Sequence, residues 1–165
     1  MAECVATLYT IGHSTRSIDE FLSALRAHSI GALVDIRSFP VSRRLPHFNR
    51  ESLEQTLSAS GIQYDSPNVA LRNASFRNYA DYMLTAEFEH GISELLSLAQ
   101  RSPTAYMCAE RVYFRCHRML VSDWLVAHGH AVLHIDAEGP PRTHKLMSEA
   151  RVVDGQVIYR GDRLL

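Results

Sequence analysis

The feature that most constrains the fold is a regular alternation of short apolar runs with segments of helical periodicity. Segments whose apolar residues recur every three to four positions separate strand-like runs at residues 7–12, 30–36, 62–64, 104–109 and 131–135. Parallel strands need long, right-handed crossovers, which are usually helices. The order therefore predicts an α/β protein with three layers, in which helices flank a mainly parallel sheet of about five strands.

Local signals predict several element boundaries. Ser17 and Glu20 have the spacing of a capping box, which indicates that a helix begins there. Asn49 is expected to cap the next helix. Gly91 is expected to divide a long helical segment at about 78–100 into two helices, or to kink it.

The end of the chain carries a turn signal. Asp154-Gly155 lies between apolar pairs at 152–158, which is typical of a β-hairpin. The sequence has no repeat, linker or low-complexity stretch. The 165 residues are therefore expected to form a single domain, with a core at about 7–136 and a small C-terminal appendage at 137–165.

Composition restricts where the protein acts. No apolar run reaches the roughly 20 residues that span a bilayer, and the N-terminus lacks a secretion signal, so we expect a cytoplasmic protein without a membrane partner. Three cysteines (Cys4, Cys108 and Cys116) are too few for a disulfide framework. The net charge of −1 means that any attraction for anions must be local.

Three loops after predicted strands contain basic residues and no acids. They cover residues 36–50, 66–80 and 111–122. Ligands of parallel sheets collect beyond the carboxyl ends of the strands, and guanidinium groups bind phosphate bidentately. The pattern predicts an anion site, although solvated arginines would also account for it. The candidate ligand-binding residues are His13, Arg37, Ser42, Arg43, Arg72 and Arg118.

The segment Cys116-His117-Arg118 is expected to open a helix. A thiol at a helix N-terminus, flanked by His and Arg, is in a setting that favours the thiolate. Glu110, at the exit of the fourth predicted strand, is a candidate general acid or base. The candidate catalytic residues are therefore Glu110, Cys116 and His117.

Other interpretations of the thiols remain open. Cys108, Cys116 and His117 could bind a metal, but their spacing matches no tight metal-binding pattern. A phosphatase loop needs five residues between Cys and Arg, whereas six separate Cys108 from Arg115, so that interpretation fails. Either cysteine could also be a small buried apolar residue. The sequence requires no cofactor.

Several motifs together resemble a known bacterial family. The motifs are Tyr9-Thr-Ile-Gly-His-Ser14, Val34-Asp-Ile-Arg37, Pro40-x-Ser42-Arg43, Phe48-Asn49, Gly61-Ile-x-Tyr64, Cys108-Ala-Glu110 and Cys116-His-Arg118, with Val132-Leu-His-Ile135 and His144 as a closing segment. They resemble DUF488, a domain of unknown function. The resemblance implies one α/β domain with a site at these motifs and no established substrate. A Leu-Gly-Gly turn common in the family is replaced by Asn68–Asn73, which lacks glycine, and Arg72 is the basic residue there.

Three functions follow from these observations. The leading hypothesis is a hydrolase or transferase acting on a nucleotide or other phosphorylated substrate, with Arg37, Arg43 and Arg118 holding the anion. The second is a thiolate–imidazole module that binds metal or does redox chemistry. The third is a non-catalytic nucleic-acid-binding module with a small footprint. The expected partner is thus a small anionic ligand or a short nucleic acid.

Overall fold

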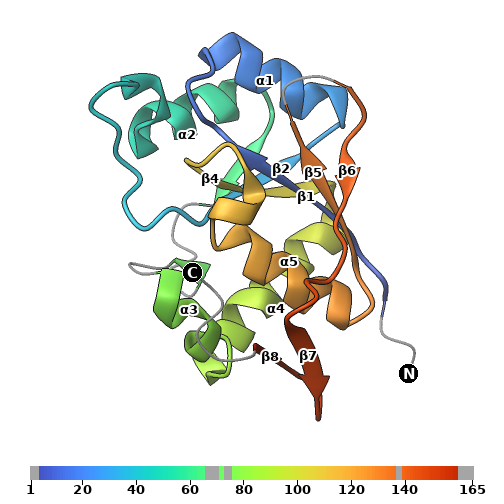
Figure 1. The fold of residues 1–165 in the computed structure, drawn as a ribbon. Helices are drawn as coiled ribbons and strands as arrows, with labels where there is room; N and C mark the ends of the chain where they lie inside the picture. Colours follow the sequence, from blue (N-terminus) through green and yellow to red (C-terminus); the bar gives the residue numbers. More distant parts are fainter. Residues whose placement is uncertain (1–3, 66–70, 73–75, 137–138, 160–165) are drawn as a thin grey trace.

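The computed structural model describes residues 4–65, 71–72, 76–136 and 139–159. They form three layers, in which a six-stranded sheet lies between two layers of helices (Figure 1). The strands lie in the order β3-β2-β4-β1-β5-β6, and every pair is parallel except β5–β6. They are β1 (Thr7–Gly12), β2 (Ala32–Asp35), β3 (Gln63–Asp65), β4 (Thr104–Cys108), β5 (Ala131–Ile135) and β6 (Arg142–Thr143). The predicted fold class is confirmed.

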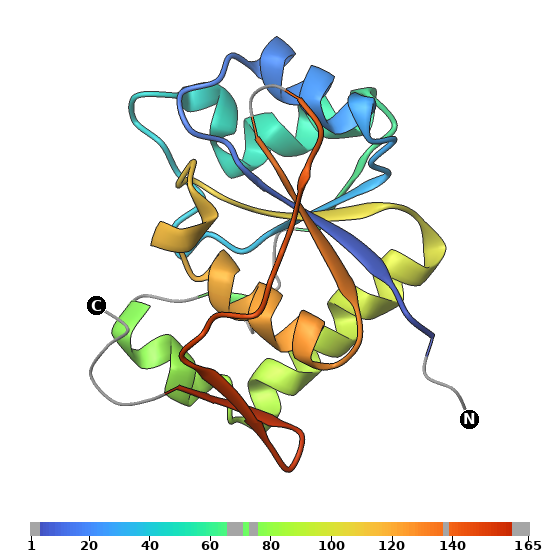
Figure 2. The same cartoon turned by 45° about the vertical axis from the view of Figure 1, so that its right-hand side comes forward.

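The helices cover both faces of this sheet (Figures 1 and 2). One face carries α1 (Ile18–Ala27) and α2 (Arg50–Ala59); the other carries α3 (Phe76–Tyr82), α4 (Ala86–Arg101) and α5 (Arg118–Ala127). Each layer has its own apolar cluster, and the fully buried Phe21 and Phe88 belong to opposite ones. Burying one such side chain contributes about 1.5–3 kcal/mol.

One helix boundary and one helix cap differ from those the sequence predicts. The capping box of α1 is confirmed by reciprocal bonds between Ser17 and Glu20. Asn49 does stand at the start of α2, but its side chain accepts from the Ser42 N–H at 2.6 Å instead of capping the helix. Gly91 was expected to divide the long helical segment; it lies buried inside α4, and the break comes earlier, where Thr85 caps that helix.

The C-terminal segment packs against the sheet and one helical layer. The hairpin of β7 (Ala150–Val153) and β8 (Gln156–Tyr159) is confirmed, and Asp154 and Gly155 both have positive φ, as its tight turn requires. Val157 of this hairpin joins the cluster beneath α4 and α5, and β6 extends the sheet. No helix in the described part of the chain is long and apolar enough to cross a membrane.

The topology marks one end of β4 as the natural ligand position. β4 lies between β2 and β1, whose following helices cover one face, while the chain leaves β4 toward α5 on the opposite face. Adjacent strands whose connections diverge in this way leave a crevice beyond their carboxyl ends. The loops after β2 and β4 are therefore the first place to search for a site.

Candidate functional site

A cavity of about 310 Å³ lies at this crevice. It is lined by Arg37, Ser38, Phe39, Cys108, Ala109, Glu110, Arg115, Cys116 and His117, which follow β2 and β4. A larger hollow of about 650 Å³ runs beside α1 and contains neither thiol. The smaller cavity holds the reactive groups, so we take it as the candidate site.

The end of β1 is shaped to let the β4 loop pass closely. A Cβ atom at Gly12 would lie 1.9 Å from the carbonyl oxygen of Glu110, so no other residue fits there without moving the backbone. Beyond Gly12 the pairing continues, since His13 N–H donates to the Cys108 carbonyl and Ser14 N–H to that of Ala109. The strand exits are thus held together tightly.

The two cavity cysteines lie side by side. The Sγ atoms of Cys108 and Cys116 are 2.7 Å apart, and both residues are buried. Cys116 comes two residues before the first residue of α5, and the Arg118 backbone N–H donates to its sulfur at 3.3 Å. A thiol so close to a helix N-terminus lies at the positive end of the helix dipole, which favours its thiolate form.

Arg118 lies beneath the thiols, with 1% of its surface exposed. Its Nε donates to Cys108 Sγ at 3.1 Å and its Nη1 to Thr10 Oγ1 at 3.0 Å. Its Nη2 donates to the carbonyls of Glu110 and Arg111 at 2.6 and 3.1 Å. Among the described residues no carboxylate forms an ion pair with Arg118. Its positive charge is therefore opposed chiefly by sulfur and by neutral oxygens.

This setting shifts the pKa values of the two thiols in opposite directions. Burial and the hydrogen bond to Cys116 raise the pKa of Cys108 well above its ordinary value. Burial also opposes ionisation of Cys116, but hydrogen bonds from Cys108 and His117 and the charge of Arg118 outweigh it, so the pKa of Cys116 is lowered well below its ordinary value. The contact between the two sulfurs therefore favours a proton on Cys108 and a thiolate on Cys116.

His117 is oriented as a partner for that thiolate. Its Nε2 lies 3.0 Å from the Ile36 carbonyl, which can only accept, so Nε2 carries a hydrogen. Its Nδ1 faces Cys116 Sγ at 3.8 Å. A nucleophile, an adjacent base and a third group that fixes the base are the parts of a cysteine-based catalytic unit.

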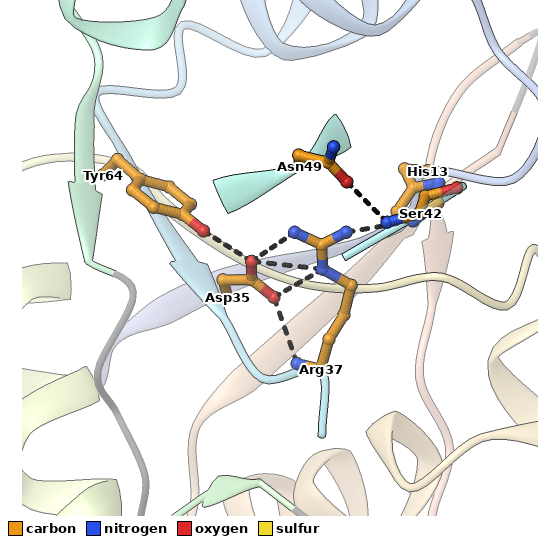
Figure 3. Close-up of polar contacts among 6 residues, drawn as sticks. All are labelled: His13, Asp35, Arg37, Ser42, Asn49 and Tyr64. Atoms are coloured by element: carbon orange, nitrogen blue, oxygen red, sulfur yellow. Dashed lines mark hydrogen bonds and ion pairs between the residues drawn. The ribbon is translucent and has the colours of Figure 1, made fainter. Parts of the chain in front are cut away.

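The opposite wall contains a second buried arginine (Figure 3). Arg37 donates from Nε and Nη2 to the Asp35 carboxylate at 2.7–3.1 Å, and the Arg37 backbone N–H donates to the same group. The Tyr64 hydroxyl donates to Asp35 at 2.6 Å. Asp35 is fully buried and Arg37 is 4% exposed, so this ion pair is a structural element that also borders the cavity.

His13 packs behind Arg37 (Figure 3). Arg37 Nη1 lies 3.4 Å from His13 Nε2, and His13 Nδ1 donates to the Ser14 carbonyl at 2.9 Å. The ring stacks on Phe48 with centroids 4.2 Å apart. Burial lowers the pKa of His13 to about 4, so the ring is neutral near pH 7.

The structure brings together four of the residues proposed from the sequence and separates the others. Arg37, Glu110, Cys116 and His117 line the cavity, together with Cys108 of the alternative metal set. The others do not line it: His13 and Arg118 are buried behind its walls, Ser42 shapes its own loop by accepting from the Leu45 N–H, Arg43 is exposed, and Arg72 is half-buried. The Asn68–Asn73 turn lies outside the described residues except for Leu71 and Arg72.

The metal interpretation gains no support. In the described ranges no group of three or more His, Cys, Asp and Glu residues is arranged to hold a metal ion.

Three buried or partly buried residues near the site were given no individual role from the sequence: Asp35, Tyr64 and His134. A signal was present for Asp35 and His134, because polar residues inside apolar strands such as β2 and β5 indicate buried partners.

Comparison with known proteins gives a family. A family described as "Domain of unknown function DUF488" matches residues 17–125, about two thirds of the chain. This chain belongs to the DUF488 family. Neither the curated proteins nor the solved structures contain a match. The DUF488 match covers every residue that lines the cavity, while β1, β5 and the C-terminal segment lie outside it.

Proposed function

We propose that this DUF488 protein is an enzyme in which Cys116 attacks a small, phosphate-bearing substrate bound in the cavity. The observation that carries the proposal is that an acidic thiol and two guanidinium groups border one small cavity at the switch point of a parallel sheet. The cavity volume of about 310 Å³ suits a small metabolite more than a macromolecule.

Arg115 and Arg37 support anion binding in different ways. Arg115 is exposed at the cavity, and within the described residues it has no ion-pair partner, so its full charge is available. Arg37 shares its charge with Asp35 and is held rigid by it, so it orients an anion more than it attracts one. The two guanidinium groups together favour a group with several acceptor oxygens.

The chemistry that fits these groups is transfer through a covalent intermediate. Cys116 Sγ forms a bond to phosphorus, the bond to the leaving oxygen breaks, and the His117 imidazolium donates its proton to that oxygen. Water or an acceptor hydroxyl then attacks phosphorus and gives its proton to His117, and the S–P bond breaks to restore the thiolate. Glu110 lines the same cavity and is a second proton carrier.

An aromatic ring at the mouth supports a nucleotide as the substrate class. Phe39 lines the cavity with 78% of its surface exposed. An exposed aromatic face beside a phosphate-binding group is a platform on which a base can stack. The sugar-phosphate would then face Arg115 and the base would lie on Phe39.

Alkylation by a charged and a neutral reagent tests the proposal. With the exposed Cys4 replaced by serine, iodoacetate should label Cys116 faster than iodoacetamide does, relative to free cysteine, and inorganic phosphate should slow both reactions. R115Q should reduce the iodoacetate preference severalfold, because it removes the unpaired charge from the cavity.

R43Q is the matched control, since Arg43 is an exposed arginine that does not line the cavity. It should leave both rates unchanged. If Cys116 shows no preference for iodoacetate and phosphate gives no protection, the anionic substrate is excluded. If R43Q has the same effect as R115Q, the preference comes from the general surface charge and not from the cavity.

A further inference from the structure

A row of buried polar side chains leads from Arg118 away from the cavity. Thr10 Oγ1, which accepts from Arg118, lies 2.6 Å from His134 Nδ1. His134 Nε2 lies 2.8 Å from His144 Nδ1, and His144 Nε2 lies 2.7 Å from Asp123 Oδ1. We call the four residues Thr10, His134, His144 and Asp123 the relay. All four are at most 4% exposed.

With both histidines neutral, the hydrogens in the relay have one consistent direction. Arg118 can only donate to Thr10, so the hydroxyl hydrogen of Thr10 is free to point at His134 Nδ1. His134 then donates from Nε2 to His144 Nδ1, and His144 donates from Nε2 to the carboxylate of Asp123. Every hydrogen finds an acceptor, with both histidines neutral, between a guanidinium and a carboxylate. Burial lowers the pKa of His134 to about 3, which fits a neutral ring.

The C-terminal segment completes this row and holds it in place. His144 follows β6, and Tyr159 of β8 donates from its hydroxyl to Asp123 Oδ2 at 2.9 Å. The Met147 backbone N–H donates to Asp123 Oδ1 at 3.0 Å. Tyr113 stacks on His134 with centroids 3.6 Å apart. Burying Arg118 together with the four residues of the relay is costly unless each polar group is paired, and here each is.

We propose that the relay is a positioning device that holds the Arg118 guanidinium against Cys108 Sγ, beneath the two thiols. Held there, its charge favours the thiolate form of Cys116. Thr10 holds one end of the guanidinium, and the Glu110 and Arg111 carbonyls hold the other. Without the Thr10 contact the guanidinium keeps three of its four hydrogen bonds and is held less firmly against Cys108 Sγ. The inference rests on the proposed function only in taking the Cys116 thiolate as the working nucleophile.

Other groups near Cys116 also influence its ionisation. They are Cys108, Tyr79 and Tyr106 from β4 and α3, His117 and Arg118 at the start of α5, and Arg37, Glu110 and Arg115 around the cavity. The test therefore changes only the far side of Arg118. T10V removes the hydroxyl with almost no change in volume, while T10S keeps it.

The measurement is the pH dependence of Cys116 alkylation by iodoacetamide in the C4S background. T10V should move the midpoint of the pH profile up by about one pH unit or more and leave the high-pH plateau unchanged, since a rise of one pKa unit moves the midpoint by one pH unit. T10S should keep the original profile. A T10V profile equal to that of the parent protein would overturn the proposal, as would a T10S profile that matches T10V.

A second measurement needs no substitution in the relay. Long-range ¹H–¹⁵N spectra of the folded protein at pH 7 report the histidine tautomers. Both His134 and His144 should be neutral and carry hydrogen on Nε2. An imidazolium or an Nδ1–H form at either residue would contradict the direction of hydrogen bonding on which the relay depends.

The two proposals fail in different ways. If Cys116 is acidic and T10V does not change it, the relay is wrong and the proposed function stands. If T10V raises the pKa of Cys116 but phosphate never protects the thiol and iodoacetate is not preferred, the relay stands and the phosphate-bearing substrate is wrong. If the pKa of Cys116 is ordinary in the parent protein, both proposals fail.

Discussion

Arg37 and Arg118 are both buried near the cavity, yet their surroundings differ. Arg37 meets the Asp35 carboxylate directly, through three of its own nitrogen atoms. The guanidinium of Arg118 donates to one sulfur, a hydroxyl and two carbonyls. Its nearest carboxylate along the hydrogen-bonded row is Asp123, at the far end of the relay. One charge is neutralised locally and the other is not.

The difference shows how one fold uses a buried cation for two purposes. A buried ion pair with good geometry leaves little net field around it. A buried cation without a direct counter-ion lowers the energy of any anion that forms beside it, and Cys116 is the group that can become one. We therefore expect Arg37 to stabilise the fold and Arg118 to set the acidity of the thiols.

The largest expected effect comes from breaking the Arg37 pair. D35N leaves a buried guanidinium without its counter-ion, so the free energy of unfolding should fall by about 3–5 kcal/mol. The acidity of Cys116 should change little, because Arg118 and His117 remain in place. Urea denaturation and iodoacetamide kinetics on the same sample measure the two properties. Loss of the acidic thiol without loss of stability would reverse the roles assigned to the two arginines.

Each arginine also has a neutral histidine nearby, which makes stability depend on pH. The folded-state pKa of His13 is about 4 and that of His134 about 3, both below the ordinary value of 6.5. Between the unfolded-state pKa and the folded-state pKa of each histidine, the unfolded chain binds more protons than the folded chain. The stability that comes from the neutral rings is therefore complete above about pH 6.5 and is lost as the pH falls from there through the folded-state values.

Each histidine can contribute on the order of 3 kcal/mol by this route. Chemical denaturation at a series of pH values between 7 and 4 should show stability falling with acidification. H13Q should flatten part of that slope, since it removes one group that takes up a proton on unfolding. A stability that is constant from pH 7 to 4 would show that neither ring is buried in its neutral form.

A smaller effect is expected when the charge of Arg118 is removed. R118M should move the midpoint of the Cys116 alkylation profile up by at least about one pH unit, which corresponds to about 1.4 kcal/mol. R37M is the matched comparison and should leave the pH profile of Cys116 nearly unchanged, whatever it does to stability. Equal shifts in the two variants would mean that the counter-ion of Arg37 does not neutralise it.

The sequence predicted those features that depend on local patterns. Alternating periodicities gave the fold class, and the Ser17–Glu20 spacing and the Asp154-Gly155 pair gave a helix start and a turn. The ends of parallel strands must share an edge, so the position of the cavity also followed. The predicted break at Gly91 was wrong because the Thr85 cap, not the glycine, sets the start of α4.

The charge relationships could not be predicted because they depend on strand order. Thr10 meets His134 only because β1 pairs with β5, and His144 reaches His134 only because β6 adds to the same edge. A hidden signal was present, since Thr10, Asp35 and His134 are polar residues inside apolar strands. Such residues need buried partners, but the sequence does not say which.

The most direct test of whether Cys116 is an acidic thiol is the pH profile of its alkylation in the C4S protein, with each labelled site identified by peptide mass. An ordinary thiol with a pKa near 8.5 loses about 50-fold in rate between pH 8.5 and 6.5. We expect Cys116 to lose no more than about threefold, because it is already a thiolate at the lower pH. A loss close to that of an ordinary thiol would show that Cys116 is not an acidic thiol.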